Sequence, residues 1–502
     1  MTDAQSEQEP ARGRGRLRLI PAPLAALLAV VFVFCVAWAL TVPPGQVPDE
    51  SHHFQYTQTI TERHALPGDG PAPFSSEEDT ALNTALRGGI TFNLEKTPEW
   101  RRQAYDDWKD FASGLPRDNG GGVIFQGDNP PLYYAYESLA YWGGSGTSFF
   151  DRLHLMRIWS ALLLLVTTTG AWLLAGEVFG RNRLLQLAAA ALAGLQPMAT
   201  FISSGVNPDA GLIAMWTIAL WLGARIVRRG LTTRDGIALG LVAGFAVWVK
   251  ATAWGFLPAA LFAIAVGWVR MRERPGPHPR APLPAALASL FGAAGGWVVT
   301  AVALGRSVVN EAPDYAGVHH PSLTSLTTLR EFTSYVWQFY LPKLPFQTPF
   351  YGMGGGAERV YDSWLKTGWG TFGWLEVHFP DWTYSLIAIA SALVILGGVT
   401  ALARANQRRR VDPLRVAFLL LAGIGLMLVL HWADYTFITV QRHPVEQGRY
   451  LLPLISIGGL ALAGTVALLR RRWQASAVGV VLALLVTLQI ASIGLTLGRY
   501  FG

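Results

Sequence analysis

Long apolar runs dominate the sequence, and they constrain the fold more than any other feature. An apolar run of about 18 or more residues can cross the hydrocarbon core of a bilayer as a helix. Only 15% of the 502 residues are charged, against about 25% in soluble domains. We therefore predict an all-α integral membrane protein with about 11 transmembrane helices. The predicted spans are residues 19–42, 155–176, 184–205, 209–227, 236–249, 252–269, 283–305, 383–403, 416–433, 450–469 and 475–496.

Short arginine clusters set the predicted orientation. They fall at alternate ends of the spans, at Arg12 to Arg18, Arg181 and Arg183, Arg225 to Arg234, Arg270 to Arg280, Arg404 to Arg415 and Arg470 to Arg472. Because loops rich in Lys and Arg stay in the cytoplasm, we expect a multi-pass plasma-membrane protein with a cytoplasmic N-terminus and an outer C-terminus. The net charge of +7 is spread over these clusters. We therefore expect membrane lipids, and no nucleic acid, as partners.

The run from 236 to 269 has basic residues at both ends, so it must cross the membrane twice. About 33 helical residues reach roughly 50 Å, against about 30 Å for one crossing. We predict two short helices with Lys250 at their outer tip. The domain organisation is then a basic tail, 1–18, followed by one transmembrane domain, 19–502.

Two predicted outer loops are long, at residues 43–154 and 306–382, and both are rich in Pro, Gly and Trp. Long loops of this kind usually carry function. We expect short amphipathic helices in the first of them, for example at 50–63 and 97–113.

The first outer loop opens with an acidic pair at the membrane surface. Pro48 ends the preceding segment, and Asp49 and Glu50 begin a new helix. Asp49 and His53 are four residues apart and share a helical face. A carboxylate beside an imidazole is suited to proton abstraction. The alternative is that the two acids only complement the dipole of the helix.

Other outer-face residues are candidates for binding, and each has a structural alternative. Asp128 could supply a second carboxylate, and Tyr133 follows a rigid double proline or serves as an interfacial anchor. Asp209 stands in Asn207-Pro208-Asp209, which is also a good helix start. Lys250 either takes part in the site or extends its amine to the interface.

The chain has two further candidate motifs. Gln447 and Arg449 lie where the tenth span begins, and a basic residue there is placed to bind a phosphate at headgroup level or to anchor the helix. Trp369 opens Trp369-Gly370-Thr371-Phe372-Gly373-Trp374 in the second long loop. These positions are distant in sequence, yet the predicted topology puts all of them on the outer face.

Six motifs in order resemble a bacterial membrane-protein family with features of the GT-C superfamily of membrane glycosyltransferases. That family's pattern is P-P-D-E-x-x-H-F, x-P-P-L-Y-Y, N-x-D, K-x-T, W-x-x-F-G-W and Q-G-R-Y-L-L-P. The matching segments here are Pro48 to Phe54, Pro130 to Tyr134, Asn207 to Asp209, Lys250 to Thr252, Trp369 to Trp374 and Gln447 to Pro453. This chain departs from the pattern at Asn129, where the family often has His, and in lacking a second proline before Asp49.

The resemblance implies a GT-C-like fold and a sugar donor carried on a polyprenyl phosphate. It assigns the catalytic base to Asp49, with support from Glu50 and His53, and gives the lipid phosphate to Lys250 and Arg449. The acceptor would be a cell-envelope glycan, lipid or protein, and the transfer would invert the anomeric configuration. GT-C enzymes differ in their need for a divalent metal, so no cofactor is assigned. The rivals are a transporter or flippase of lipid-linked saccharides and a non-catalytic subunit of an envelope assembly complex.

Overall fold

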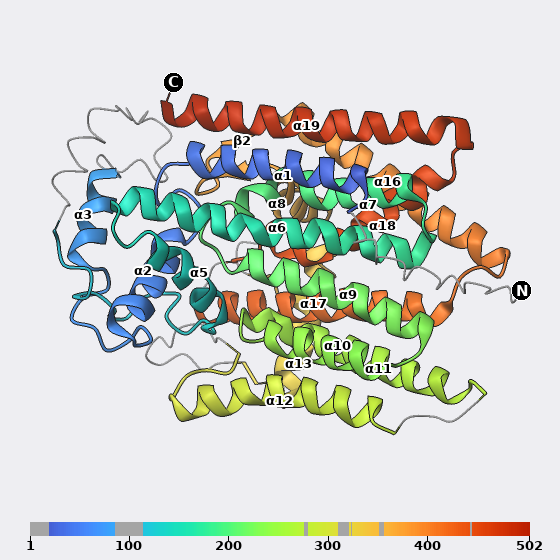
Figure 1. The fold of residues 1–502 in the computed structure, drawn as a ribbon, viewed down its shortest axis with the longest axis horizontal. Coiled ribbons are helices and arrows are strands. Elements are labelled where there is room, and N and C mark those ends of the chain that lie inside the picture. The colour runs from blue at the N-terminus through green and yellow to red at the C-terminus, as the bar shows by residue number, and fades with distance from the viewer. Residues whose placement is uncertain are drawn as a thin grey trace, which may run out of the picture.

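A computed structural model describes residues 20–85, 114–275, 280–309, 321–322, 324–350, 356–441 and 444–501. Within these residues the chain is almost entirely helical. Long helices run side by side along one direction, and the short helices α2, α3 and α5 gather at one end of them (Figure 1). The predicted tail 1–18 and the predicted helix 97–113 lie outside the described residues.

The long helices of the bundle are α1 (Ala22–Thr41), α6 (Phe149–Phe179), α9 (Asp209–Arg229), α11 (Leu257–Arg272), α12 (Pro282–Ala303), α16 (Asp381–Gln407), α17 (Pro413–Gln441) and α19 (Arg471–Phe501). The shorter ones are α2 (Glu50–Gln58), α3 (Ser76–Ala85), α5 (Leu132–Gly143), α7 (Arg183–Leu195), α8 (Pro197–Ser203), α10 (Thr233–Ala246), α13 (Leu326–Tyr340), α14 (Ala357–Arg359), α15 (Thr367–Trp369) and α18 (Ile455–Ala467). Helices of π or 3-10 type are η1 (Thr59–Arg63), η2 (Ala251–Phe256), η3 (Val360–Lys366) and η4 (Gly448–Leu454). A two-stranded antiparallel ribbon joins β1 (Thr371–Phe372) to β2 (Val377–His378).

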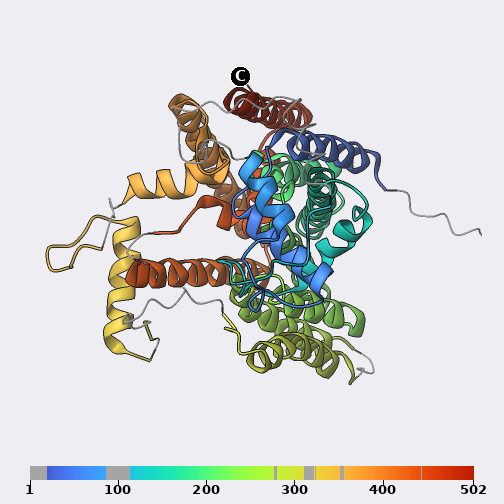
Figure 2. The same cartoon turned by 90° about the vertical axis from the view of Figure 1, so that its left-hand side faces the viewer.

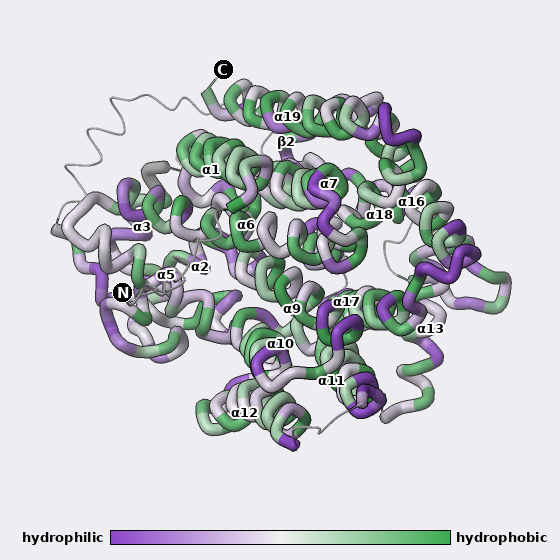
Figure 3. The backbone as a smooth tube through the Cα atoms, turned by 45° about the vertical axis from the view of Figure 1, so that its right-hand side comes forward, coloured by the Kyte–Doolittle hydropathy of each residue, from purple (hydrophilic) through white to green (hydrophobic). Residues whose placement is uncertain are grey.

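The predicted all-α membrane fold is confirmed, and each predicted span coincides with helical structure. Among the described residues, nine helical stretches are long and apolar enough to cross a membrane, and the bent pair α7 and α8 makes a tenth. The remaining predicted span is α10, which has 14 residues. Hydrophobic residues cover the lengths of the helices, and hydrophilic residues collect near their ends (Figure 3).

Helices α10 and α11 lie where the double crossing was predicted, although α10, with 14 residues, is shorter than the stretches that qualify as spans. Helix α10 ends at Ala246, and Lys250 lies in extended conformation just before η2, which leads into α11. Helix α10 packs closely on α12, since a Cβ on Gly240 would lie 2.7 Å from the carbonyl oxygen of Ala286. Small residues let helix backbones approach in this way within a membrane.

The predicted span 184–205 is bent by 56° between α7 and α8. Pro197 is the cause, because a proline disfavours helical geometry in the residue before it, and Gln196 is extended with ψ 125°. The Gln196 side chain fills the break by accepting the N–H of Ala199 at 2.6 Å. Its amide also donates to the carbonyl of Gly368 at 2.6 Å, which ties the second long loop to the bundle.

The described parts of the two long loops that were predicted to be outer lie at the same end of the bundle. The helix predicted at 50–63 is present as α2 and η1, and Trp374 of the second loop donates its indole N–H to the carbonyl of Gly45 at 2.9 Å. Viewed from this end, α2 and α3 lie over the ends of the long helices, and α13 lies at the edge beside α17 (Figure 2). The loops therefore form a cap built from distant parts of the chain.

Candidate functional site

Asp49 occupies a strained turn at the start of α2. Its φ is 62°, in the left-handed region, and its side chain makes no capping hydrogen bond to the helix. Few non-glycine residues adopt this conformation, and such residues collect at functional sites. The carboxylate is 25% exposed and lies 3.6 Å from the guanidinium Nη2 of Arg449. Its orientation therefore does not follow from helix capping.

Glu50, the neighbouring acid, has a different environment. Its side chain is 1% exposed and pairs with Arg157 of α6, whose Nε donates to Oε1 at 2.7 Å and whose Nη2 donates to Oε2 at 2.5 Å. The N–H of Gly45 also donates to Oε2 at 3.0 Å. Arg157 donates further to the carbonyls of Ala39, Val42 and Pro43. This arrangement fixes the end of α1 against α2 and leaves Glu50 fully engaged.

His53 is 2% exposed, and its Nδ1 lies 2.9 Å from the hydroxyl of Tyr134. The imidazole therefore pairs with Tyr134 and does not orient Asp49 as the helical spacing suggested. Tyr134 also accepts a hydrogen bond from the Asn129 amide at 2.9 Å, and Tyr56 stacks on its ring at 3.7 Å. Burial, and then the positive charges of Lys250 and Arg449, hold the pKa of His53 well below its usual value. The ring is neutral at physiological pH.

Asp209 and Lys250 form an ion pair in which the Lys250 amine donates to Asp209 Oδ1. The other oxygen, Oδ2, is buried without a hydrogen-bond partner. The Asn207 side chain accepts the N–H of Asp209 at 2.9 Å, as expected of a helix start. Its amide donates to the carbonyl of Pro48 at 3.1 Å. The start of α9 is thus joined to the turn that holds Asp49.

Arg449 lies at the start of η4 with its side chain 6% exposed. Its Nη2 donates to the Tyr450 hydroxyl at 3.1 Å, while Nε and Nη1 are buried without a hydrogen-bond partner. The Tyr450 ring lies between two cations, 5.0 Å from the Arg449 guanidinium carbon and 5.1 Å from the Lys250 amine. Two cations and two acids thus meet around one tyrosine, although Asp49 and Arg449 are 400 positions apart.

The loop that carries Arg449 is held by close backbone contact. A Cβ on Gly448 would lie 2.1 Å from the carbonyl oxygen of Trp364, so only glycine fits there. The N–H of Gly448 donates to the Thr367 hydroxyl at 2.5 Å. Gln447 precedes this contact, and its carbonyl accepts the N–H of Tyr450 at 3.0 Å. Trp369 is half-buried and packs against the apolar core beside this loop.

Four of the sequence-predicted residues come together at one place: Asp49, Asp209, Lys250 and Arg449. Tyr133 is buried and accepts the N–H of Asn207 at 2.7 Å, so it supports the start of α9. Asp128 is exposed and lies apart from these four residues. Burial raises the pKa of Tyr56, and the negative charge of Asp128 raises it further. We refer to Asp49, Asp209, Lys250, Arg449 and Tyr450 as the outer charge cluster.

Sequence reasoning missed Arg157, Tyr134 and Tyr450. Arg157 had a recognisable signal, because a lone charge in an apolar span needs a partner. Tyr134 and Tyr450 lay within the quoted motifs without a distinctive spacing.

The chemistry available to the outer charge cluster is anion binding beside a carboxylate. Two buried guanidinium nitrogens of Arg449 have unused N–H groups, and such groups bind phosphate oxygens well. Among the described residues no group of three or more His, Cys, Asp or Glu side chains is placed to hold a metal ion.

Comparisons with known proteins give a family and a group of similar structures. A sequence profile described as "Predicted membrane protein (DUF2142)" matches residues 32–457. No curated protein matches the chain significantly.

Solved structures with a similar arrangement include the Archaeoglobus fulgidus oligosaccharyltransferase in its apo form, with 13% identity, a TM-score of 0.49, and coverage of 95% of this chain and 56% of that one. The same archaeal protein, AglB, in complex with an inhibitory peptide and a dolichol-phosphate has 14% identity and a TM-score of 0.48, over 95% of this chain and 56% of that one. ArnT from Cupriavidus metallidurans bound to undecaprenyl phosphate has 13% identity and a TM-score of 0.44, over 91% of this chain and 62% of that one. The chain therefore spans little more than half the length of the archaeal protein.

Proposed function

The chain belongs to the DUF2142 family of predicted membrane proteins, and we propose that it is a glycosyltransferase acting at the outer face of the membrane. The donor is a sugar on a polyprenyl phosphate, and the acceptor is a hydroxyl-bearing component of the cell envelope. The observation that carries this proposal is a partly exposed carboxylate, Asp49, beside a buried arginine with two unused N–H groups. The motif resemblance to GT-C enzymes points to the same class of reaction.

In the proposed reaction the acceptor oxygen attacks the anomeric carbon of the donor sugar. The bond from that carbon to the phosphate oxygen breaks, and the acceptor proton passes to the Asp49 carboxylate. One displacement inverts the anomeric configuration. The phosphate gains negative charge as it leaves, and Arg449 and Lys250 stabilise that charge at the outer charge cluster. Such stabilisation of developing charge is usually the largest contribution to catalysis.

The neighbouring groups hold in place the carboxylate that takes the proton and the cations that stabilise the phosphate. Asp209 holds the Lys250 amine, and the Tyr450 ring lies between both cations. Glu50 and Arg157 fix the turn from which Asp49 projects. His53 stays neutral in its contact with Tyr134. We therefore assign Glu50 and His53 to positioning and reserve proton transfer for Asp49.

The test compares Asp49→Asn with Asp128→Asn in purified full-length protein reconstituted in nanodiscs. A panel of radiolabelled polyprenyl-phosphate monosaccharides serves as donor, with cell-envelope extracts as acceptor. Asp49→Asn keeps the size of the side chain but cannot take a proton, so turnover should fall about 10²–10⁴-fold. Asp128 is an exposed acid of the same loop, so its variant should stay near the native rate. Near-native turnover of Asp49→Asn would overturn the assignment, and transfer from a nucleotide sugar without lipid would overturn the donor.

A further inference from the structure

Helix α5 in the cap has apolar side chains on its outward face and polar side chains on its inward face. Leu139 is 61% exposed and Trp142 is 73% exposed, and Ala135 on the same face is exposed as well. The inward face carries Glu137, the only charged residue of α5, which is 0% exposed, together with three buried tyrosines. A helix that faces water shows the reverse pattern. The outward face of α5 is therefore suited to an apolar surrounding.

This outward face is continuous with the apolar surface of a neighbouring span. Helix α5 packs against the cap end of α6, where the short helices gather (Figure 1). A Cβ on Gly143, at the end of α5, would lie 3.9 Å from Leu155 Cδ2 of α6, and Leu155 is 39% exposed. Because α6 is long and apolar enough to cross a membrane, the apolar side chains exposed along it face lipid. The outward face of α5 extends this lipid-facing surface.

The end of α1 marks the hydrocarbon boundary at the cap end of the bundle. Helix α1 has 20 residues, which rise about 30 Å as an α-helix, and this is the thickness of the hydrocarbon core. Arg157 of α6 donates to the carbonyl of Ala39 at 3.0 Å and to the carbonyl of Pro43 at 2.9 Å. Arg157 therefore lies at the level of this boundary.

An aromatic pair fixes α5 close to the same level. The Tyr136 hydroxyl donates to the carbonyl of Trp159 at 2.8 Å, and the Trp159 indole donates to the carbonyl of Tyr136 at 3.1 Å. Their rings stack with centroids 5.2 Å apart. Because Trp159 follows Arg157 by two residues, it lies about 3 Å further along α6. Tyrosine and tryptophan are enriched at this depth in membrane proteins.

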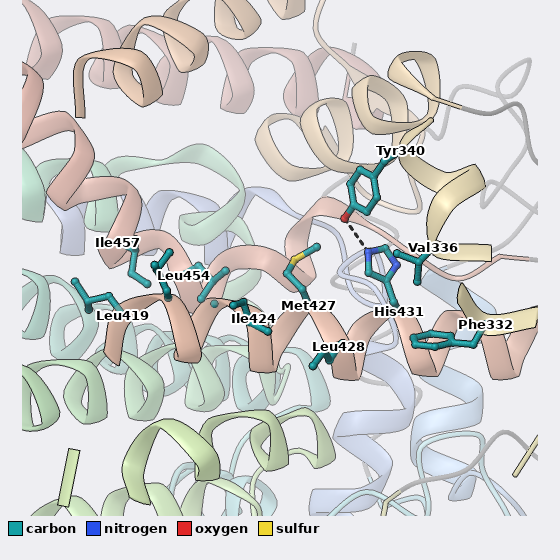
Figure 4. Close-up of a pocket in the computed structure, with 12 residues that line it drawn as sticks. Phe332, Val336, Tyr340, Leu419, Ile424, Met427, Leu428, His431, Leu454 and Ile457 are labelled. Atoms are coloured by element: carbon teal, nitrogen blue, oxygen red, sulfur yellow. Dashed lines mark hydrogen bonds between the residues drawn. The ribbon is translucent and has the colours of Figure 1, made fainter. Parts of the chain in front are cut away.

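Helix α17 gives a second, independent marker of the boundary. Its side chains line an apolar pocket of about 460 Å³, and the part of this lining that comes from α17 begins at Leu419 and ends at His431. Figure 4 shows the apolar side chains along α17 and, past them, the His431 imidazole, whose Nε2 lies 2.7 Å from the Tyr340 hydroxyl. His431 follows Pro413, the first residue of α17, by 18 positions, which is about 27 Å of helix. The polar pair therefore lies where one crossing ends.

The loop that carries Arg449 begins just beyond this level. Asp434 lies three residues past His431 on α17, and its Oδ1 accepts the N–H of Val445 at 2.7 Å and that of Glu446 at 3.2 Å. These two residues lead directly to Arg449. Both markers thus place the start of the cap at the edge of the hydrocarbon core.

We propose that the outward face of α5 lies in the phospholipid leaflet at the cap end, with Leu139 and Trp142 among the upper parts of the acyl chains. The inward face of α5 supports the start of α9, because the Tyr133 hydroxyl accepts the N–H of Asn207. This placement sets the outer charge cluster at headgroup level. The consequence for the donor rests on the proposed function: the phosphate of a membrane lipid reaches the two cations of the cluster without leaving the leaflet.

The experiment measures the depth of spin labels on single cysteines, in full-length protein reconstituted in vesicles of phosphatidylcholine and phosphatidylglycerol without any sugar donor. The background is Cys35→Ala, since Cys35 is buried. Labels at Leu139→Cys and Trp142→Cys report on α5. Leu393→Cys in the span α16 is the matched lipid control, because Leu393 is also 61% exposed. Asp79→Cys on α3 is the water control, because Asp79 is an exposed acid of the cap. Collisions with oxygen, which concentrates in lipid, are compared with collisions with a water-soluble nickel complex.

The labels at Leu139→Cys and Trp142→Cys should collide more with oxygen than with the nickel complex. Their depth should be about 5–10 Å into the boundary between headgroups and acyl chains, as for interfacial helices. The label at Leu393→Cys should lie deeper, and the label at Asp79→Cys should respond mainly to the nickel complex. A label at Ser51→Cys, two residues after Asp49, should lie near phosphate level.

Two results would overturn the proposal. Access of the nickel complex to both α5 labels as high as at Asp79→Cys would place the outward face in water. Few collisions with either reagent would show that a second copy of the chain or another protein covers this face. Because no donor is present, a failed glycosyltransferase assignment would leave the measured depths unchanged, so the two failures are distinguishable.

Discussion

Replacing Glu50 by glutamine tests whether Glu50 has a structural role while the neighbouring Asp49 has a chemical one. The two acids differ in environment, because Glu50 is buried against Arg157 and Asp49 is partly exposed. Glu50 is 1% exposed and Arg157 is 0% exposed. The Arg157 guanidinium contacts the Glu50 carboxylate and three backbone carbonyls. In Glu50→Gln the carboxylate charge is lost, and the new amide group brings a donor toward the donors of Arg157. The arginine is left buried without its counter-charge.

The expected cost follows from that burial. Breaking a buried ion pair by removing one partner destabilises a protein by about 3–5 kcal/mol. Asp49→Asn removes a partner that is 25% exposed and 3.6 Å from Arg449, without a hydrogen bond between them, so it should lower the free energy of unfolding by less than Glu50→Gln does. The double variant Glu50→Gln/Arg157→Gln should lose less free energy of unfolding than the sum of the losses in the two single variants. The reason is that the double variant leaves no buried charge without a partner.

The assay is the free energy of unfolding of the four variants in mixed micelles, measured beside their turnover. Glu50→Gln should have a lower free energy of unfolding than the native protein. Its turnover should fall only in proportion to the unfolded fraction. Asp49→Asn should lose turnover with its stability nearly intact. If Glu50→Gln melted like the native protein and lost turnover in the folded state, the structural assignment of Glu50 would be wrong.

Three further predictions address topology, pH and backbone packing. Cysteines introduced near residues 100 and 360 should react with an impermeant reagent from outside intact cells, and labelling only after permeabilisation would refute the orientation; the native Cys35 is buried and should stay silent. Burial lowers the pKa of His53, so below pH of about 6.5 the unfolded chain binds a proton that the folded chain does not. Stability should fall on acidification through that value, and equilibrium unfolding should show a weaker pH dependence in His53→Gln. Gly448→Ala places a Cβ 2.1 Å from the Trp364 carbonyl, so it should displace Arg449 and raise the KM for the lipid donor, whereas an unchanged KM would show that the loop tolerates the shift.

The membrane fold and the grouping of the outer residues could be read from the sequence. Apolar run length fixes where helices cross, since each crossing must be about 20 residues long. The alternation of basic clusters then placed Asp49, Asp209, Lys250 and Arg449 on one predicted side. Among these residues the structure shows two ion pairs and a shared tyrosine. The bend at Pro197 could also have been expected from its effect on Gln196.

The partners of individual side chains depended on tertiary structure. Helical spacing favoured a pair between Asp49 and His53. In the structure Asp49 has a left-handed backbone conformation, and the His53 imidazole instead contacts the hydroxyl of Tyr134, which is 81 positions from His53 in the sequence. No local pattern distinguishes Asp49 from Glu50. Their difference arises because Arg157, 107 positions later in α6, lies buried against only one of them.

A buried polar network around His431 is a product of packing alone. His431, Asp434, Glu446 and Tyr335 come from two helices and a loop, and neither their spacing nor the composition around them marks a site. The sequence by itself determined the apolar helical spans, because burial of apolar surface in a bilayer depends on local run length. It also predicted that the candidate residues share one side of the membrane. Which acid remains free and which is neutralised was decided only by the tertiary structure, because ion pairing depends on distances between segments far apart in the chain.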